Sequence, residues 1–431
     1  MPLRVEGELR VPSDKSISHR AIIIGSLADG EVRVKNWLRS ADTLATLNIY
    51  RALGARIEEL SPTELVVRGG GLFSFREPGD ILNAENSGTT TRLTLGVLSA
   101  QPFFAVLTGD GSLRRRPMLR VVKPLREMGA TIDGREEGNL LPIAVRGGRL
   151  KGISFFNKKA SAQVKSALLL AGLHAEGITE VEEPYLSRDH TERMLQLFEV
   201  DLTVIPAEGG ILVKLRGGQQ PKGDKDIFVP ADPSSAAFFA AAAVLLPGSK
   251  LLLKDVLINP TRDGFFRKLK EMGANIEYTN VRELSMEPIA DIYVEYSPNL
   301  RGVRVFPEEV PAMIDELPLL AVVATQAEGE TRIEGAAELR VKESDRIKAV
   351  VENLRKMGAK VEELPDGMVI EGKTPLRGGV EIKTYDDHRI AMAFTIAGLI
   401  ADKPVKLDNP QCVSVSYPQF FEDLKRVLKE G

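Results

Sequence analysis

The chain has 431 residues, of which 43% are hydrophobic and 27% are charged, and its formal net charge is −3. This composition is typical of a globular protein with room for two or three hydrophobic cores, and the slightly negative charge argues against attachment to nucleic acid by bulk positive charge. The single cysteine, Cys412, excludes an internal disulfide and any metal site built from several cysteines.

No segment of the chain predicts a membrane partner. The most apolar stretch, residues 236–246, is shorter than the roughly 20 residues that a membrane-spanning helix needs. The chain begins with strand-like alternation rather than a signal sequence. A cytoplasmic protein is therefore expected.

Six polar clusters each precede a short stretch that is apolar on every side. Their markers are Ser16, Gly88, Gln163, Ser235, Glu316 and His388, spaced by 72, 75, 72, 81 and 72 residues. This period indicates one folding unit used six times, with the apolar stretches as buried helices. Because a helix start presents free N–H groups and the positive end of the helix dipole, several starts facing one place would form a strong anion site.

A second pattern repeats in step with the first. The segment at residues 51–55, which ends in Gly-Ala, recurs at 126–130, 270–274 and 355–359. Each copy is typical of an amphipathic helix that stops at glycine and leads into a strand. Six units of this kind, each with one buried helix, one half-exposed helix and short strands, predict an α/β (α+β) protein. We expect two lobes of three units: residues 1–14 with 230–431, and residues 15–229.

The first cluster contains Lys15 and Ser16, with Arg20 one helical turn later. A helix capped near Ser16, with charges in solvent, would explain these residues without any ligand. The second cluster is harder to explain in this way. Gly88 would let a ligand approach the backbone, and Arg92 falls in an otherwise apolar helix. Because a buried guanidinium without an anion is costly, we expect a ligand anion beside Arg92.

The next clusters are less specific. The run Arg114–Arg116 has the ordinary interpretation of a solvated face. In the third unit, Ser161 and Gln163 offer neutral donors, and the polar group 187–190 follows, in which His190 is expected to be structural.

The second half of the chain supplies carboxylates. Asp315 opens a buried helix, where an N-cap is the ordinary explanation. Residues 342–346 precede an amphipathic helix and could be a capping cluster with surface ion pairs. Residues 386–389 place two cationic or switchable groups, His388 and Arg389, at a further helix start.

Together these segments resemble the EPSP synthase (5-enolpyruvylshikimate-3-phosphate synthase) family. The matching segments are residues 13–20, 86–92, 340–346 and 387–389, which occur in order over essentially the whole chain. The segment 342–346 is the most specific of them. Residues 188–192 and 259–262 resemble the subgroup called class II.

The resemblance implies a two-lobed enolpyruvyl transferase fold of six βαβαββ repeats, three per lobe, with the active site in the interlobe cleft. It implies transfer of the enolpyruvyl group of phosphoenolpyruvate to the 5-hydroxyl of shikimate 3-phosphate, with release of phosphate. It also implies a monomer with these two small anions as its partners, no nucleic acid and no cofactor. The four histidines lack zinc-ligand spacing, and no Walker or dinucleotide glycine motif is present.

The resemblance also assigns residues to each substrate. Those similar to the shikimate 3-phosphate site are Lys15, Ser16, Arg20, Ser161, Ala162, Gln163, Ser187, Arg188, Asp315 and Lys342. Those similar to the phosphoenolpyruvate site are Lys15, Gly88, Thr89, Arg92, Arg116, Gln163, Arg346, His388 and Arg389. Asp315 and Glu343 resemble the acid–base pair, with Lys15 steadying phosphate as the third catalytic residue.

Three positions depart from the family pattern. Ala162 stands where many members have a second serine, Val415 where they have a late lysine, and Glu338 where an asparagine is expected. The first two remove one potential contact to phosphate and one to phosphoenolpyruvate. Sensitivity to glyphosate, a competitor of phosphoenolpyruvate in this family, stays open, since class II segments suggest tolerance and Gly88 suggests sensitivity.

Three other functions fit the sequence less well. The related transferase that acts on UDP-N-acetylglucosamine usually carries a loop cysteine as general acid, whereas the only cysteine here is Cys412. A non-catalytic clamp around nucleic acid would place its basic groups on a solvated surface rather than in buried helices. A simple metabolite-binding scaffold would avoid carboxylates such as Asp315 and Glu343 beside an anion.

Overall fold

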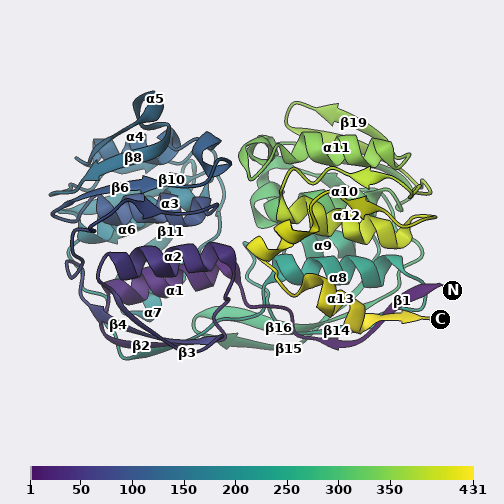
Figure 1. Cartoon of the computed structure of the whole chain (residues 1–431), viewed down its shortest axis with the longest axis horizontal. Coiled ribbons are helices and arrows are strands. Elements are labelled where there is room, and N and C mark those ends of the chain that lie inside the picture. Colours follow the sequence, from purple (N-terminus) through teal and green to yellow (C-terminus); the bar gives the residue numbers. More distant parts are fainter. Residues whose placement is uncertain (1) are drawn as a thin grey trace. The chain divides into compact units, whose positions relative to one another are not determined.

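The computed structural model describes residues 2–431, and the contacts within it divide the chain into two compact units (Figure 1). Unit 2 comprises Ser13–Val229, and unit 1 comprises the residues up to Pro12 together with Pro230–Gly431. The chain therefore passes between the units at 12/13 and 229/230, where the sequence predicts crossings at 14/15 and 229/230. Within residues 2–431, no helix has the length and apolarity needed to cross a bilayer.

Unit 2 contains three four-stranded sheets with one plan. In each sheet two strands pair in parallel and two more continue the sheet antiparallel. The first sheet has the order β13 (Lys225–Phe228), β2 (Asp29–Lys35), β4 (Glu64–Gly70), β3 (Arg56–Ser61). The second has β5 (Leu82–Asn83), β6 (Phe104–Thr108), β8 (Leu140–Arg146), β7 (Thr131–Gly134). The third has β9 (Ser154–Phe156), β10 (Ile178–Glu183), β12 (Gly210–Arg216), β11 (Leu202–Ala207).

Each of these sheets carries one buried helix and one half-exposed helix. The buried helices are α1 (Lys15–Leu27), α3 (Gly88–Leu98) and α6 (Ala162–His174). The half-exposed helices are α2 (Ala41–Ala52), α4 (Leu119–Glu127) and α7 (His190–Leu197), and the short helices η1 (Leu113–Arg115) and α5 (Arg135–Gly138) lie in the second repeat. Because α1, α3 and α6 have no wide polar face, they bury nearly all of their side chains, as the sequence predicts.

Unit 1 repeats the same plan with a shortened last copy. Its main sheet has the order β15 (Asn275–Leu284), β16 (Glu287–Glu295), β14 (Lys250–Leu257), β1 (Leu3–Leu9), β23 (Leu428–Glu430). A second sheet contains β17 (Arg304–Val305), β18 (Gly329–Ile333), β20 (Gly367–Gly372) and β19 (Lys360–Leu364), and a third only β21 (Glu381–Ile382) and β22 (Lys406–Leu407). In the last repeat β21 pairs in parallel with β22, and β23 pairs antiparallel with β1 of the main sheet.

The buried helices of unit 1 are α8 (Pro233–Leu245), α10 (Leu317–Ala324) and α12 (His388–Ile400). Its half-exposed helices are α9 (Gly264–Glu271), α11 (Arg346–Lys356) and α13 (Phe420–Val427), with short 3₁₀ helices η2 (Pro307–Ala312), η3 (Ile314–Glu316), η4 (Ala337–Val341) and η5 (Pro410–Val415). Aromatic contacts fix α13 on α8, since the rings of Phe238 and Phe239 each lie 5.9 Å from the ring of Phe420.

The repeated Gly-Ala segments end four of the half-exposed helices, as predicted. Gly54, Gly129, Gly273 and Gly358 follow α2, α4, α9 and α11 with φ angles of 95°, 109°, 101° and 87°. Glycine takes this left-handed conformation at little cost, so it stops each helix at a fixed place and starts the next strand.

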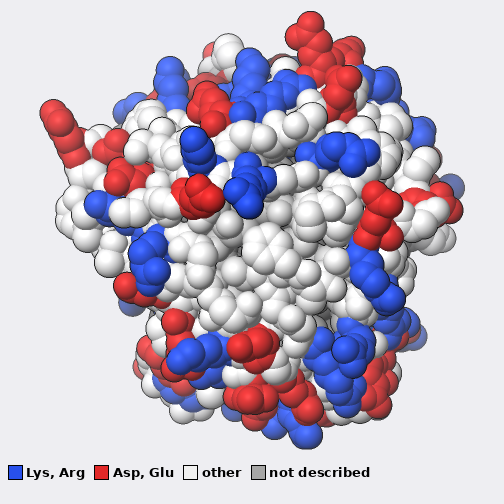
Figure 2. Space-filling view, turned by 90° about the vertical axis from the view of Figure 1, so that its left-hand side faces the viewer, with Lys and Arg blue, Asp and Glu red and all other residues white. Residues whose placement is uncertain are grey.

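Figure 2 shows the face of unit 2 on the left of Figure 1. Uncharged residues occupy its centre, and Lys or Arg alternates with Asp or Glu around its margin. A stripe of one sign, which nucleic-acid binding would need, is not visible on this face.

Candidate active site

The buried helices of unit 2 begin at the polar clusters found in the sequence. Asp14 caps α1 by accepting from the N–H of Ile17 at 2.8 Å, Ser87 caps α3, and Ser161 caps α6. Ser16 is therefore not the cap; it lies in the first turn because Asp14 already has the extended backbone and the acceptor that an N-cap requires. Because these residues are the caps, the polar residues that follow them in each cluster lie in the first turn of each helix.

Gln163 connects the starts of α3 and α6. Its side-chain oxygen accepts from Arg92 Nη1 at 2.7 Å, and its side-chain nitrogen donates to the Thr89 hydroxyl at 3.0 Å. Arg92 also donates to the carbonyl of Pro117 at 3.0 Å. Neutral oxygens thus hydrogen-bond this buried guanidinium, so its burial does not by itself require the ligand anion that the sequence predicts beside it.

Gly88 lets two guanidinium groups lie over the start of α3. A Cβ atom at this position would come within 2.6 Å of Arg116 Nη2 and 2.8 Å of Arg92 Nη1. Arg116 is only 6% exposed and donates to the carbonyl of Asn86, although Arg114 and Arg115 are exposed. The interpretation of this run as a solvated face is therefore wrong for Arg116, because the turn η1 directs it inward.

The cations of the first cluster are held by groups from other helices. Arg20 is 3% exposed and donates to the hydroxyls of Thr191 at 2.8 Å and Ser166 at 3.1 Å, which ties α1 to α7 and α6. Arg188 donates to the Ser16 hydroxyl at 3.3 Å.

Lys15 has a partner that sequence reasoning missed. Its ammonium lies 2.9 Å from a carboxylate oxygen of Asp42, which is in the first turn of α2. Asp42, two residues after the capping Ser40, is a signal for a helix start, but nothing in the sequence connects it to Lys15.

A chain of buried hydroxyls runs beneath these helix starts. The His19 ring meets the Thr46 hydroxyl at 2.7 Å, Thr46 meets Thr90 at 2.7 Å, and Thr90 meets Ser87 at 2.6 Å. Burial lowers the pKa of His19 to about 3, so this histidine is neutral near pH 7. It fixes α1, α2 and α3 relative to one another and has no sign of a catalytic role.

Hydrogen bonds to the buried carboxylate of Glu183 hold the third cluster in place. Ser187 is 1% exposed and donates its hydroxyl to both oxygens of Glu183, at 3.0 and 2.9 Å. His190 is buried at the first position of α7, which agrees with a structural role, and Ala162 lies half-buried in the first turn of α6.

In unit 1, Arg346 gathers three carboxylates. Its Nε donates to Asp387 Oδ2 at 2.8 Å, its Nη1 donates to Asp315 Oδ1 at 3.2 Å, and its Nη2 donates to Glu343. Arg346 is 1% exposed, so these charge-assisted bonds form largely away from water. The three acids come from separate parts of the chain, and one guanidinium orients the two that the resemblance assigns to proton transfer.

Asp315 is not the N-cap that the sequence suggests. It lies in the turn η3, and α10 has no side-chain cap among the described residues, because Asp315 is directed to Arg346. The capping interpretation of residues 342–346 is correct only for Asp345, which accepts from the N–H of Lys348 and pairs with Arg340. Removal from water lowers the pKa of Lys342 to about 8, although Asp315 and Glu343 act in the opposite direction.

The start of α12 contains the remaining cations. His388 meets the Ser416 hydroxyl at 2.5 Å, and its other ring nitrogen lies 3.8 Å from Glu343. Arg389 is 3% exposed, and its Nε and Nη1 have no hydrogen-bond partner within residues 2–431. A buried guanidinium with open donors is costly, which favours an anionic ligand at this position.

The remaining departures from the family pattern lie close to these residues. Val415 ends η5, next to Ser416, and brings no charge. Glu338 lies in η4.

The carboxylates of Glu343 and Asp387, together with His388, are close enough to hold a metal ion. Arg346 already donates to both of these carboxylates, so the negative charge that would attract a metal ion is already compensated by a guanidinium of the protein.

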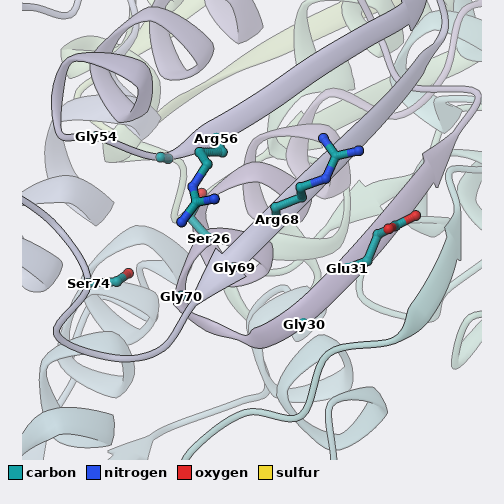
Figure 3. Close-up of a pocket in the computed structure, with 10 residues that line it drawn as sticks. Ser26, Gly30, Glu31, Gly54, Arg56, Arg68, Gly69, Gly70 and Ser74 are labelled. Carbon is teal, nitrogen blue, oxygen red and sulfur yellow. The ribbon is translucent and has the colours of Figure 1, made fainter.

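A pocket of about 300 Å³ lies elsewhere in unit 2 (Figure 3). Arg56 and Arg68 extend in different directions there, and none of the candidate residues lines it. The lining comprises Ser26, Gly30, Glu31, Gly54, Ala55, Arg56, Arg68, Gly69, Gly70 and Ser74.

Comparisons with known proteins agree with the resemblance seen in the sequence. The family model for EPSP synthase (3-phosphoshikimate 1-carboxyvinyltransferase) matches residues 1–424. The chain is 63% identical over 425 residues to a 3-phosphoshikimate 1-carboxyvinyltransferase of Persephonella marina, with 99% of this chain and 98% of the relative covered. It is 61% identical over 426 residues to the protein of the same name from Aquifex aeolicus, with the same coverage.

Solved structures give the same result for the fold. An EPSP synthase from Acinetobacter baumannii superposes with a TM-score of 0.86 at 44% identity, covering 100% of this chain and 98% of that one. The enolpyruvyl transferase NikO from Streptomyces tendae, at 18% identity, has a TM-score of 0.76 with 99% and 96% covered, and so supports the two-lobed enolpyruvyl transferase fold alone. The matches do not favour the transferase that acts on a UDP-sugar. The chain belongs to the EPSP synthase family.

Proposed function

We propose that this chain transfers the enolpyruvyl group of phosphoenolpyruvate to the 5-hydroxyl of shikimate 3-phosphate, releasing inorganic phosphate. The observation that carries the proposal is the 63% identity, over 99% of the chain, to a protein named for this carboxyvinyl transfer. The helix starts in both units then supply the cations and acids that such a reaction needs.

The charges are suited to the two substrates. Shikimate 3-phosphate and phosphoenolpyruvate together carry about six negative charges near neutral pH. The proposed site offers eight cations against them: Lys15, Arg20, Arg92, Arg116, Arg188, Lys342, Arg346 and Arg389. Six of these are arginines, whose forked donors suit phosphate and carboxylate oxygens.

We assign shikimate 3-phosphate to the residues around α1, α6 and Lys342. In unit 2 these are Lys15, Ser16, Arg20, Ser161, Ala162, Gln163, Ser187 and Arg188, and in unit 1 Asp315 and Lys342. The Ser187 hydroxyl already donates to Glu183, so it must turn from this bond to donate to phosphate. Ala162 offers no hydroxyl, and the backbone N–H groups at the α6 start are the donors available in its place.

We assign phosphoenolpyruvate to the guanidinium groups at the other helix starts. The residues are Lys15, Gly88, Thr89, Arg92, Arg116 and Gln163 in unit 2, and Arg346, His388 and Arg389 in unit 1. The open donors of buried Arg389 support this assignment most strongly. Since Val415 has no charge, Arg389 would take a larger share of the substrate's carboxylate or phosphate.

The reaction is an addition followed by an elimination. The 5-hydroxyl oxygen of shikimate 3-phosphate attacks the substituted carbon of phosphoenolpyruvate and loses its proton, while the methylene carbon gains a proton and becomes a methyl group. The tetrahedral ketal then loses a methyl proton and its phosphate, which restores the double bond. We propose that Asp315 takes the hydroxyl proton, that Glu343 exchanges protons at the methyl carbon, and that Lys15 steadies the phosphate.

Arg346 orients this pair of acids. It hydrogen-bonds both Asp315 and Glu343 and therefore sets where their oxygens point. The two carboxylates retain further lone pairs for substrate, and their roles can be exchanged between addition and elimination, as microscopic reversibility allows.

Because residues from both units enter the proposed site, we place it in a cleft between the lobes. Repulsion among the cations would keep the empty lobes apart, and bound anions would draw them together and exclude water from the intermediate. X-ray scattering with both ligands should show a smaller radius of gyration, and an unchanged radius would contradict this closure. We further propose that the chain works as a cytoplasmic monomer on small anions, without nucleic acid or membrane.

A phosphate-release assay tests the proposed function. Release should require both substrates and should be matched mole for mole by the enolpyruvyl product. Release with UDP-N-acetylglucosamine in place of shikimate 3-phosphate, or no release with both proposed substrates, would overturn the proposal.

A further inference from the structure

Unit 2 contains an ion pair that is completely removed from solvent. Lys165 on α6 lies 2.8 Å from a carboxylate oxygen of Glu183 at the end of β10, and both side chains are 0% exposed. A second carboxylate, that of Glu192 on α7, lies 2.9 Å from the same ammonium. Taking charges out of water costs free energy that their attraction barely offsets, so an ion pair of this kind is weak evidence for a role in stability alone.

The pair holds every polar group of Ser187. Glu183 accepts from the Ser187 N–H at 2.8 Å and from its hydroxyl at 3.0 and 2.9 Å. Lys165 donates to the Ser187 carbonyl at 3.2 Å. The position of Ser187, and of Arg188 directly after it, is therefore set by two buried charges and not by the loop itself.

The same carboxylate also reaches the start of α6. Asn157 donates one hydrogen bond to Glu183 Oε2 at 3.2 Å and another to the carbonyl of Ser161 at 2.9 Å. Ser161 is the N-cap of α6. Glu183 thus connects two segments, ending at Ser161 and beginning at Ser187, that are far apart in the sequence but belong to the same proposed binding site.

We propose that Lys165 and Glu183 are positioning residues that fix the spacing between the α6 start and the Ser187–Arg188 segment for shikimate 3-phosphate. Neither side chain touches the ligand in this arrangement, since both are fully enclosed by protein. Holding the α6 start and Arg188 in place before the ligand arrives lowers the entropy lost on binding and so raises affinity, and only the Ser187 hydroxyl has to turn from Glu183. This inference rests on the proposed function, because it names the substrate that the two segments receive.

The role requires a carboxylate at position 183. All four groups that bond to Glu183 are donors: the Lys165 ammonium, the Ser187 N–H and hydroxyl, and the Asn157 amide. A glutamine has nearly the same shape but replaces one acceptor oxygen with an NH₂ group. In Glu183→Gln the new NH₂ group would face other hydrogen-bond donors. The variant should therefore lose the hydrogen bonds to Ser187, to Asn157 or to both.

Unit 1 offers a control lysine with the same kinds of partner, although its two carboxylates are 57% and 32% exposed. Lys268 is 3% exposed, lies 2.7 Å from Glu271 and 2.7 Å from Glu309, and donates to the carbonyl of Arg304 at 3.0 Å. Like Lys165, it is a buried lysine with two carboxylates and one carbonyl. None of these partners belongs to the proposed site, so Lys268→Met reports the general effect of losing such a cation.

The test is calorimetric titration of shikimate 3-phosphate into wild type, Glu183→Gln, Lys165→Met and Lys268→Met, each first shown by thermal melting to be folded at 25 °C. We expect Kd for shikimate 3-phosphate to rise about tenfold or more in the two unit 2 variants, as loss of one or two charge-assisted bonds implies. KM for phosphoenolpyruvate at saturating shikimate 3-phosphate should stay within about twofold. Lys268→Met should melt at a lower temperature but keep Kd within about twofold.

Should the charge variants not fold, Asn157→Ala keeps the ion pair and removes the two hydrogen bonds that connect Glu183 to Ser161, and we expect it to raise Kd about threefold. Unchanged Kd in the folded variants, or an equal rise in Lys268→Met, would overturn the inference. If wild type itself fails to bind shikimate 3-phosphate, the proposed function is wrong; if wild type binds and the variants bind equally well, only the positioning role is wrong.

Discussion

If Lys342 binds shikimate 3-phosphate as proposed, its lowered pKa should make the affinity depend on pH between 7 and 9. Loss of water around the ammonium lowers this pKa to about 8. About 90% of Lys342 is then protonated at pH 7 and only about 9% at pH 9, whereas a lysine in water stays about 96% protonated at pH 9. If the charged form binds the substrate, affinity should fall about tenfold over this range. The phosphate of the ligand is already a dianion above pH 7, so its own ionisation cannot imitate the effect.

The measurement is Kd for shikimate 3-phosphate by calorimetry at half-unit steps from pH 6.5 to 9.5, with Lys342→Arg as the control. Arginine stays charged throughout, so the variant should bind more weakly at pH 7 because its geometry differs, but with little dependence on pH. A wild-type profile that is flat up to pH 9, or an Arg variant with the same slope as wild type, would refute the role assigned to Lys342.

Three further outcomes are expected. Asp315→Asn and Glu343→Gln should each lower kcat about 10²- to 10⁴-fold and change Kd for shikimate 3-phosphate much less, in steady-state and calorimetric measurements; near-normal turnover in either variant removes that residue from proton transfer. Gly88→Ala should raise KM for phosphoenolpyruvate by tenfold to about 100-fold, because the added Cβ would lie 2.6 Å from Arg116 Nη2; an unchanged KM would mean that Arg116 does not bind this substrate. The pKa of His19 is lowered to about 3 in the folded chain, whereas in the unfolded chain it is about 6.5, so below pH 6.5 the unfolded chain binds a proton that the folded chain does not. The contribution of this group to the free energy of unfolding is therefore complete above pH 6.5 and is lost as pH falls towards 3. Chemical denaturation should show a loss of about 2 kcal/mol from this group at pH 5, absent in His19→Gln, and equal acid sensitivity in both proteins would contradict it.

The helix starts could be predicted from sequence because each depends on local chemistry. Capping, the all-apolar stretches and the glycine stops act within a few residues, and the regular spacing of about 72 residues repeats the signal six times. The starts of α1, α3, α6, α8, α10 and α12 accordingly lie at their predicted clusters. Only the ordinary explanation of Asp315 as a cap for α10 is wrong, because a distant arginine binds this carboxylate.

The partners of the charged residues could not be predicted, because they lie on other elements tens of residues away. Lys15 pairs with Asp42, 27 residues away, and Arg346 bonds with Asp387, 41 residues away. The charge pattern of residues 114–116 alone could not tell which arginine turns inward, since this depends on the short helix η1, and only the family resemblance selected Arg116. The pairing of Lys165 with Glu183 could not be predicted either, because a lysine in an apolar helix gives no sign of which carboxylate it will meet.

We propose above that helix starts and guanidinium groups from both units bind one pair of anions. The most direct test is a crystal structure with shikimate 3-phosphate and phospholactate, a saturated analogue of phosphoenolpyruvate that cannot react. We expect shikimate 3-phosphate against Ser161, Gln163 and Arg188, and the analogue against Arg116 and Arg389. Either ligand bound elsewhere, or bound by residues of one unit only, would contradict it.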